Sequence, residues 1–159
     1  MEETTRPKPQ PISNDTSTQD EKQQAFVNLK NNFGLEFAKK IEQLFRWETG
    51  HFTSDQFKEG FSPGMVATKT TYPFGWASLD EFNKQNSIDG RRYGIGRTFV
   101  VKGKNFRYVK FPNFTTAVNF VSWFIRNKRG GVVQKWNSLD TTASNKYLSD
   151  LNTIKTHFV

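Results

Sequence analysis

A single carboxylate interrupts the apolar face of a predicted helix. Apolar residues recur at spacings of three and four before it, which predicts an amphipathic helix over residues 35–48. Glu48 falls on the same face, three residues after Phe45 and four after Leu44. Burial raises the pKa of such a carboxyl group, because it penalises the charged form. A carboxyl group of this kind can donate a proton near neutral pH, so Glu48 is our candidate for a general acid.

The end of the predicted helix supports the same choice. Gly50 is expected to close the helix, which leaves Glu48 beside the negative end of the helix dipole. We expect Glu48 to be buried by the apolar residues before it, Trp47 included. The alternative is structural: a frayed last turn would let Glu48 face solvent or pair with Arg46 or with a basic residue of a later hairpin.

The N-terminal half of the chain has two helices after a polar start. Residues 1–20 are rich in Pro, Thr and Ser and are interpreted as a flexible tail, so the predicted domain covers 21–159. A first helix is predicted over 21–33, with Gly34 ending it. Residues 51–82 then carry too many glycine and proline residues for a long element, which predicts a structured loop region with several aromatic residues.

The second half is predicted to contain a hairpin between helices. Ser78 and Glu81 fit a capping box that opens a short helix. Alternation over 98–111, with residues 102–105 as the turn, predicts a β-hairpin. Two further helices are predicted, over 113–127 with Asn113 or Thr115 as the cap, and over 144–158 with Tyr147 on its apolar face. The order of elements predicts an α+β fold that is mainly helical.

Composition excludes several classes of protein and favours an anionic partner. The chain has no cysteine and only two histidines, so neither a disulfide framework nor a metal site or cofactor is expected. No apolar run reaches the ~20 residues of a membrane span, and the start has no secretory signal, so synthesis in the cytoplasm is expected. Net charge is +8, and from Gly90 to Leu139 every charged residue is basic. The basic region 91–135 is therefore predicted to attract anionic polymers, unless it is only a solvated face.

The segment IEQLFRWETGHFTSDQF resembles the catalytic helix of the lysozyme-like superfamily, above all its glucosaminidase branch. Glu48-Thr49-Gly50 stands where that branch has its Glu-Ser-Gly triplet, and Ser54 stands at the place of its serine. The stretch FRYVKFPNFTTAVNFVSWFI is similar to the family's hairpin strand and following helix. The resemblance implies a bilobal domain with a small β-hairpin lobe, and cleavage of the peptidoglycan backbone beside an N-acetylated amino sugar. The lack of a secretory signal, the polar tail and the basic region would suit a protein carried on a virion or released to act on the cell wall, as a phage lysin is.

The resemblance suggests further site residues. A second carboxylate would lie tens of residues after the acid, and the candidates are Asp80, Glu81 and Asp89, each of which could instead have a capping or turn role. His51 and Ser54 could orient Glu48 or a water molecule. Aromatic residues that could stack on sugar rings, or simply pack in the core, follow in the irregular region: Tyr72, Phe74 and Trp76.

Two departures from the family's pattern keep another function open: the partner carboxylate and a tyrosine are lost. The family tends to have a tyrosine on the helix after the hairpin, where this chain has Phe120 and Trp123. The alternative is a non-catalytic virion or structural protein that keeps a lysozyme-like fold. In a variant of it the basic region, with aromatic residues interleaved, binds a nucleic acid.

Overall fold

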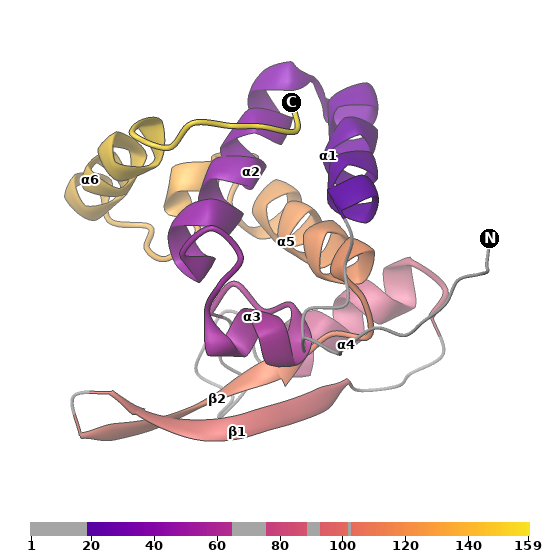
Figure 1. The fold of residues 1–159 in the computed structure, drawn as a ribbon, viewed down its shortest axis with the longest axis vertical. Helices are drawn as coiled ribbons and strands as arrows, with labels where there is room; N and C mark the ends of the chain where they lie inside the picture. The colour runs from indigo at the N-terminus through magenta and orange to yellow at the C-terminus, as the bar shows by residue number, and fades with distance from the viewer. Residues whose placement is uncertain (1–18, 65–75, 89–92, 102) are drawn as a thin grey trace.

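Helices predominate in the computed structural model, which describes residues 19–64, 76–88, 93–101 and 103–159 (Figure 1). The mainly helical character predicted from the sequence is confirmed, and the predicted hairpin is present as a two-stranded antiparallel sheet. The first helix begins two residues before its predicted start, and the rest of the predicted tail lies outside the described residues. In chain order the elements are α1 (Gln19–Phe33), α2 (Leu35–Thr49), α3 (Asp55–Gly60), α4 (Trp76–Gln85), β1 (Gly94–Val101), β2 (Lys104–Lys110), α5 (Phe114–Lys128), η1 (Val133–Lys135) and α6 (Thr141–Asn152).

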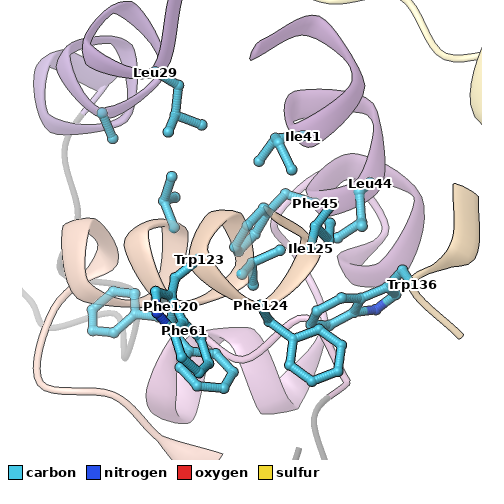
Figure 2. Packing of buried hydrophobic residues seen from close by; sticks show 14 of the residues in the cluster. Leu29, Ile41, Leu44, Phe45, Phe61, Phe120, Trp123, Phe124, Ile125 and Trp136 are labelled. Atoms are coloured by element: carbon cyan, nitrogen blue, oxygen red, sulfur yellow. The ribbon is translucent and has the colours of Figure 1, made fainter. Parts of the chain in front are cut away.

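Helix α5 is the central element of the core (Figure 2). It contacts α1, α2 and α4. Most of its residues are buried, because its own sequence is apolar on nearly every side. Of the two predicted caps Asn113 is the one used, since its side chain accepts a hydrogen bond from the backbone N–H of Thr116 at 2.8 Å.

Aromatic rings fill the space between α1, α2 and α5. The ring of Phe114 lies 5.8 Å from that of Phe26, 5.5 Å from that of Phe45 and 5.8 Å from that of Phe57, each in an edge-to-face arrangement. Rings of this size bury large areas and prefer such geometry, so a chain with few aliphatic residues still forms a core. The core is therefore rich in aromatic residues.

The hairpin packs on the short helix α3, below the helical layer in Figure 1. Gly60 lies so close to β2 that an added Cβ would be 2.5 Å from the Cα of Lys110, so only glycine fits there. The backbone N–H of Phe111 also donates to the carbonyl of Gly60 at 2.9 Å. These contacts hold β2 against the segment that directly follows α2.

The turn of the hairpin is shorter than predicted. Val101 pairs directly with Lys104, so Lys104 and Asn105 belong to β2 and not to the turn. Gly103 has a φ of 77°, a backbone conformation that glycine adopts readily in two-residue hairpin loops.

The predicted capping box was also wrong. Ser78 is the third residue of α4, which begins at Trp76, so it lies inside the helix and is not its cap. The carboxylate of Glu81 instead accepts hydrogen bonds from Gln85 at 3.2 Å and from Lys128 on α5 at 2.7 Å. A tertiary ion pair has replaced the local pairing that the sequence pattern indicates.

The last helix is displaced from its predicted range of 144–158. It begins at Thr141, where Asp140 accepts a hydrogen bond from the backbone N–H of Ala143 at 2.8 Å, and it ends at Asn152. Residues 153–159, called the C-terminal strap below, leave the helix and return across α2 (Figure 1).

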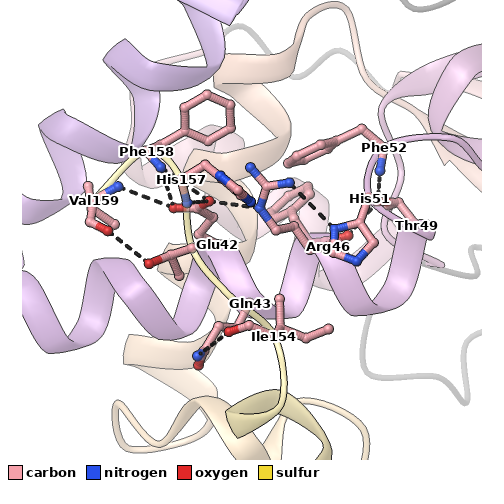
Figure 3. A network of polar contacts seen from close by, with 12 residues as sticks. Glu42, Gln43, Arg46, Thr49, His51, Phe52, Ile154, His157, Phe158 and Val159 are labelled. Carbon is pink, nitrogen blue, oxygen red and sulfur yellow. Dashed lines mark hydrogen bonds and ion pairs between the residues drawn. The ribbon is translucent and has the colours of Figure 1, made fainter.

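A buried carboxylate on α2 holds the C-terminal strap (Figure 3). Glu42 is fully buried and accepts backbone N–H bonds from His157 at 2.6 Å, Phe158 at 3.0 Å and Val159 at 3.3 Å. Its other partner is the Nε of Arg46, at 2.8 Å. The strap could not have continued as a helix and made these bonds, which explains why α6 ends early.

Candidate active site

The last turn of α2 places Glu48 at a sharp change in chain direction. Gly50 caps the helix in the left-handed conformation, as predicted, and His51 and Phe52 also have positive φ angles of 57° and 70°. Buried Thr49 holds this turn, because its hydroxyl donates to the carbonyl of Phe45 at 2.5 Å and accepts from the backbone N–H of Phe52 at 2.8 Å. Residues other than glycine adopt positive φ angles only where the surrounding contacts enforce them.

Two residues from distant parts of the chain hold the Glu48 carboxyl group. The hydroxyl of Tyr147 on α6 donates to Oε2 of Glu48 at 2.5 Å. The side-chain amide of Asn137, between η1 and α6, donates to the same oxygen at 3.2 Å. Both contacts follow from the packing of α6 and η1 against α2.

The surroundings of Glu48 favour its protonated form. Burial raises the pKa of Glu48 above its ordinary value, and the hydrogen bonds from Tyr147 and Asn137, which favour the charged form, oppose that rise only in part. Glu48 also lies one residue from the C-terminal end of α2, where the helix dipole disfavours an anion. Trp47 contributes less to this burial than the sequence suggests, since its side chain is 43% exposed.

Tyr147 stays protonated and therefore remains a donor. Burial raises the pKa of its phenol well above the ordinary value, and the charge of Glu48, the hydrogen bond to Glu48 and the charge of Asp150 raise it further. The phenol cannot serve as a base near neutral pH. Its role in this geometry is to hold one oxygen of Glu48 in place.

The hairpin side of the molecule also reaches Glu48. Burial, and then the charge of Glu48, raise the pKa of the phenol of Tyr108 on β2. Gly64, in the segment after α3, lies so near that a Cβ added there would be 3.6 Å from Oε1 of Glu48. The carboxyl group thus lies where α2, α6 and the hairpin side of the fold meet.

A small pocket adjoins this site. It has a volume of about 220 Å³ and is lined by residues 134–150 of η1, the following loop and α6, among them Asn137 and Tyr147. The two residues that hold Glu48 therefore also form part of a pocket wall.

Among the described residues, no second carboxylate is hydrogen-bonded to Glu48. Glu81 is engaged by Lys128 at 2.7 Å, and neither it nor Asp80, also on α4, is among the described hydrogen-bond partners of Glu48. Asp89 lies outside the described residues. Within the described residues, hydrogen bonds thus link Glu48 to Tyr147 and Asn137 and not to Asp80 or Glu81.

The other predicted site residues have local contacts. The ring Nδ1 of His51 lies 3.5 Å from Nη1 of Arg46. It therefore lies beside the Glu42 cluster, by which we mean Glu42, Arg46 and the backbone N–H groups of residues 157–159. Ser54 caps α3, since its hydroxyl accepts from the backbone N–H of Phe57 at 3.3 Å. Trp76 is half-buried and packs against the core, while Tyr72 and Phe74 lie outside the described residues.

The described residues contain no group of three or more histidines and carboxylates that could hold a metal ion. Within the same residues, no helix has the length and apolar character needed to cross a membrane.

Tyr147 and Asn137 were not predicted as site residues. Tyr147 was expected on the apolar face of the last helix, and its hydroxyl was the only sign in the sequence that this face needed a polar partner. Asn137 lies in a loop and gave no sign.

Comparisons with known proteins add no family to this description: no family model, no curated protein and no solved structure matched the chain. The geometry around Glu48 and the sequence resemblance are therefore the features that bear on function.

Proposed function

We propose that the protein cleaves the glycan strand of peptidoglycan at a β-1,4 linkage beside an N-acetylated amino sugar, with Glu48 as the general acid. The observation that carries the proposal is the position of the Glu48 carboxyl group, which Tyr147 and Asn137 hold by hydrogen bonds and whose pKa is raised by burial. A half-buried carboxyl at the end of a helix, followed by Thr-Gly, agrees with what the lysozyme-like resemblance implies.

In the proposed reaction, Glu48 gives its proton to the glycosidic oxygen as the bond from that oxygen to C1 of the sugar breaks. The bonding electron pair stays on the leaving oxygen, and Glu48 becomes a carboxylate. Water then supplies a hydroxyl group to C1, and its remaining proton restores neutral Glu48. An enzyme that forms an anhydro sugar would use a hydroxyl group of the sugar itself in place of water.

Protonation of the leaving group is the step in which the site can contribute most. General acid catalysis by a well-placed group accelerates such steps by about 10²–10⁴-fold. The carboxyl must be neutral at the working pH and fixed in direction, and the surroundings of Glu48 favour both conditions.

The test is turnover of purified peptidoglycan by the wild-type protein, Glu48→Gln and Glu36→Gln. Glu36 is an exposed glutamate at the other end of α2, so Glu36→Gln controls for the loss of a negative charge from the same helix. We expect cleavage by the wild type and Glu36→Gln and none by folded Glu48→Gln. Mass spectrometry of the fragments identifies the linkage, since the new chain end names the sugar and an anhydro end lacks one water.

Failure of the wild type to cleave walls from a broad panel of bacteria would contradict the proposal. Salt-sensitive binding of the intact protein to wall polymers or to DNA would then favour the non-catalytic alternative.

A further inference from the structure

The two oxygens of the Glu48 carboxyl group have different surroundings. Oε2 accepts hydrogen bonds from both Tyr147, at 2.5 Å, and Asn137, at 3.2 Å. No residue in the described part of the chain donates a hydrogen bond to Oε1. A carboxyl oxygen offers about two acceptor positions, so the two donors fill those of Oε2.

The proton of neutral Glu48 therefore belongs on Oε1. If Oε2 carried it, the hydroxyl of Tyr147 would have to accept, and its own hydrogen would lose the acceptor that the structure provides. Leaving a buried donor without an acceptor is costly, by about 1–3 kcal/mol in general. A carbonyl oxygen at Oε2 and a hydroxyl at Oε1 satisfy all three groups.

Oε1 faces a part of the backbone that has no side chain. Gly64 has a φ of +88°, and a Cβ built on it would lie 3.6 Å from Oε1, its one neighbour within 4 Å among the residues that the structure describes. Any other residue at this position would put carbon directly beside the oxygen. Glu48 and Gly64 are each only half-buried, so both residues keep some exposed surface.

We propose that Oε1 of Glu48 is the atom that delivers the proton, and that Gly64 keeps the path to it open for the glycosidic oxygen of the substrate. The inference rests on the proposed function, because it names the atom and the direction of approach at the same site. Gly64 is then a specificity-determining position: a larger residue there would exclude the polysaccharide from the acid without touching the acid.

The test compares Gly64→Ala with Gly131→Ala. Gly131 has a φ of +80°, and a Cβ added to it would have no neighbour within 4 Å in the described part of the chain, so alanine there brings similar backbone strain without a new contact among those residues. We expect Gly64→Ala to lower the turnover number on peptidoglycan by about 10- to 100-fold, since a displacement of ~1 Å at a reacting atom has effects of this size. Gly131→Ala should stay within about twofold of the wild type at equal folded fraction.

A second readout does not depend on activity. A methyl group beside Oε1 removes water from it, so the Glu48 carboxyl resonance, identified by its absence in Glu48→Gln, should titrate at higher pH in Gly64→Ala than in the wild type. A purely structural effect of the substitution would leave that titration unchanged.

A third measurement needs no substitution at Gly64, in case alanine prevents folding. Adding N-acetylglucosamine hexamer to folded Glu48→Gln should shift the backbone amide resonance of Gly64 and leave that of Gly131 in place. An unshifted Gly64 resonance under saturating hexamer would overturn the inference.

The two proposals fail in different ways. A wild-type protein that cleaves no glycan overturns the proposed function and this inference together. A wild type that cleaves, with Gly64→Ala and Gly131→Ala equally active, overturns only the inference.

Discussion

The carboxyl group of Glu48 is less hydrated than that of an exposed glutamate, and this loss of water is the main cause of its raised pKa. Tyr147 and Asn137 act in the opposite direction, because each donates a hydrogen bond that stabilises the charged form. Burial outweighs these two hydrogen bonds, so the carboxyl group stays neutral to a higher pH than usual. The hydrogen bonds hold it in one orientation.

Glu48→Gln should change how stability depends on pH. A carboxyl group whose pKa is higher in the folded than in the unfolded state binds more protons when folded, so it lowers stability as pH rises through the interval between the two values. We expect the free energy of unfolding of the wild type to fall relative to that of Glu48→Gln as pH rises from below about 4.5. Urea unfolding at several pH values measures this difference, and a difference that stays constant with pH would contradict the raised pKa.

Tyr147→Phe should move the pH profile of the proposed reaction. It removes a hydrogen bond that favours charged Glu48, so the pKa of Glu48 rises further and the decline of activity at high pH shifts to higher pH. Tyr93→Phe is the matched control, because the Tyr93 hydroxyl donates to Asn83 at 2.9 Å, away from Glu48. Equal shifts in the two variants, or a shift to lower pH in Tyr147→Phe, would argue against this role for Tyr147.

The acid could be predicted from the sequence because its signal is local: a carboxylate on an apolar helix face before a glycine. Its partner Tyr147 is 99 residues away along the chain, and only the packing of α6 on α2 brings the two together. Local patterns do not report contacts of that kind. For the same reason they missed the ion pair between Glu81 and Lys128.

At the scale of the elements, α2 joins the site to the C-terminal strap. Glu42 lies six residues before Glu48 on this helix and binds the last three residues of the strap, while Arg46 places its guanidinium over the rings of Phe52 and Phe158 at 4.9 and 5.1 Å (Figure 3). The strap thus ties the end of α6, which carries Tyr147, back onto α2.

Glu42→Ala should destabilise the whole domain. It leaves the Arg46 charge and three backbone N–H groups without their acceptor, and breaking a buried ion pair generally costs about 3–5 kcal/mol. Glu81→Ala removes a surface ion pair with Lys128 instead, which is expected to cost less than about 1 kcal/mol. Urea unfolding of both variants measures the contrast, and similar losses would show that the Glu42 cluster is not a main support of the fold.

Helix positions were predictable from apolar spacing, and helix ends less so. The predicted helix 35–48 ends one residue before α2 does, and the predicted helix 113–127 is one residue earlier than α5 at both ends, because glycine and asparagine caps mark these helices locally. The apolar spacing over 144–158 continues through Ile154 and Phe158, which do contact the fold, but as part of the strap. Helix α6 ends before these residues because Glu42, on α2, accepts the backbone hydrogen bonds of the strap.

At the scale of the whole molecule, the net charge of +8 favours association with anionic polymers. Part of the basic region serves packing: the guanidinium groups of Arg126 and Arg129 lie over the rings of Phe33 and Phe124 at 4.0 and 4.8 Å. Exposed Arg107 and Lys110 on β2 are better placed to meet a partner.

Binding to anionic cell walls should weaken with salt, since the Debye length falls from about 10 Å at 0.1 M to about 3 Å at 1 M. We expect the double substitution Arg107→Gln and Lys110→Gln to reduce wall binding more than Lys30→Gln and Lys58→Gln, which remove the same charge from exposed sites on α1 and α3. Co-sedimentation with purified walls over a salt series measures both effects. Equal losses in the two double variants would mean that net charge alone matters, and salt-independent binding would exclude a charge-driven mechanism.

The most direct test of Glu48 as a general acid compares the wild type with Glu48→Gln on two substrates. One is a peptidoglycan oligosaccharide with its natural linkage, and the other is the same oligosaccharide carrying 2,4-dinitrophenol, which departs without protonation. We predict a loss of about 10²–10⁴-fold for Glu48→Gln on the natural linkage and of less than about tenfold on the dinitrophenyl substrate. Equal losses on both substrates, or no loss on the natural linkage, would contradict the role proposed for Glu48.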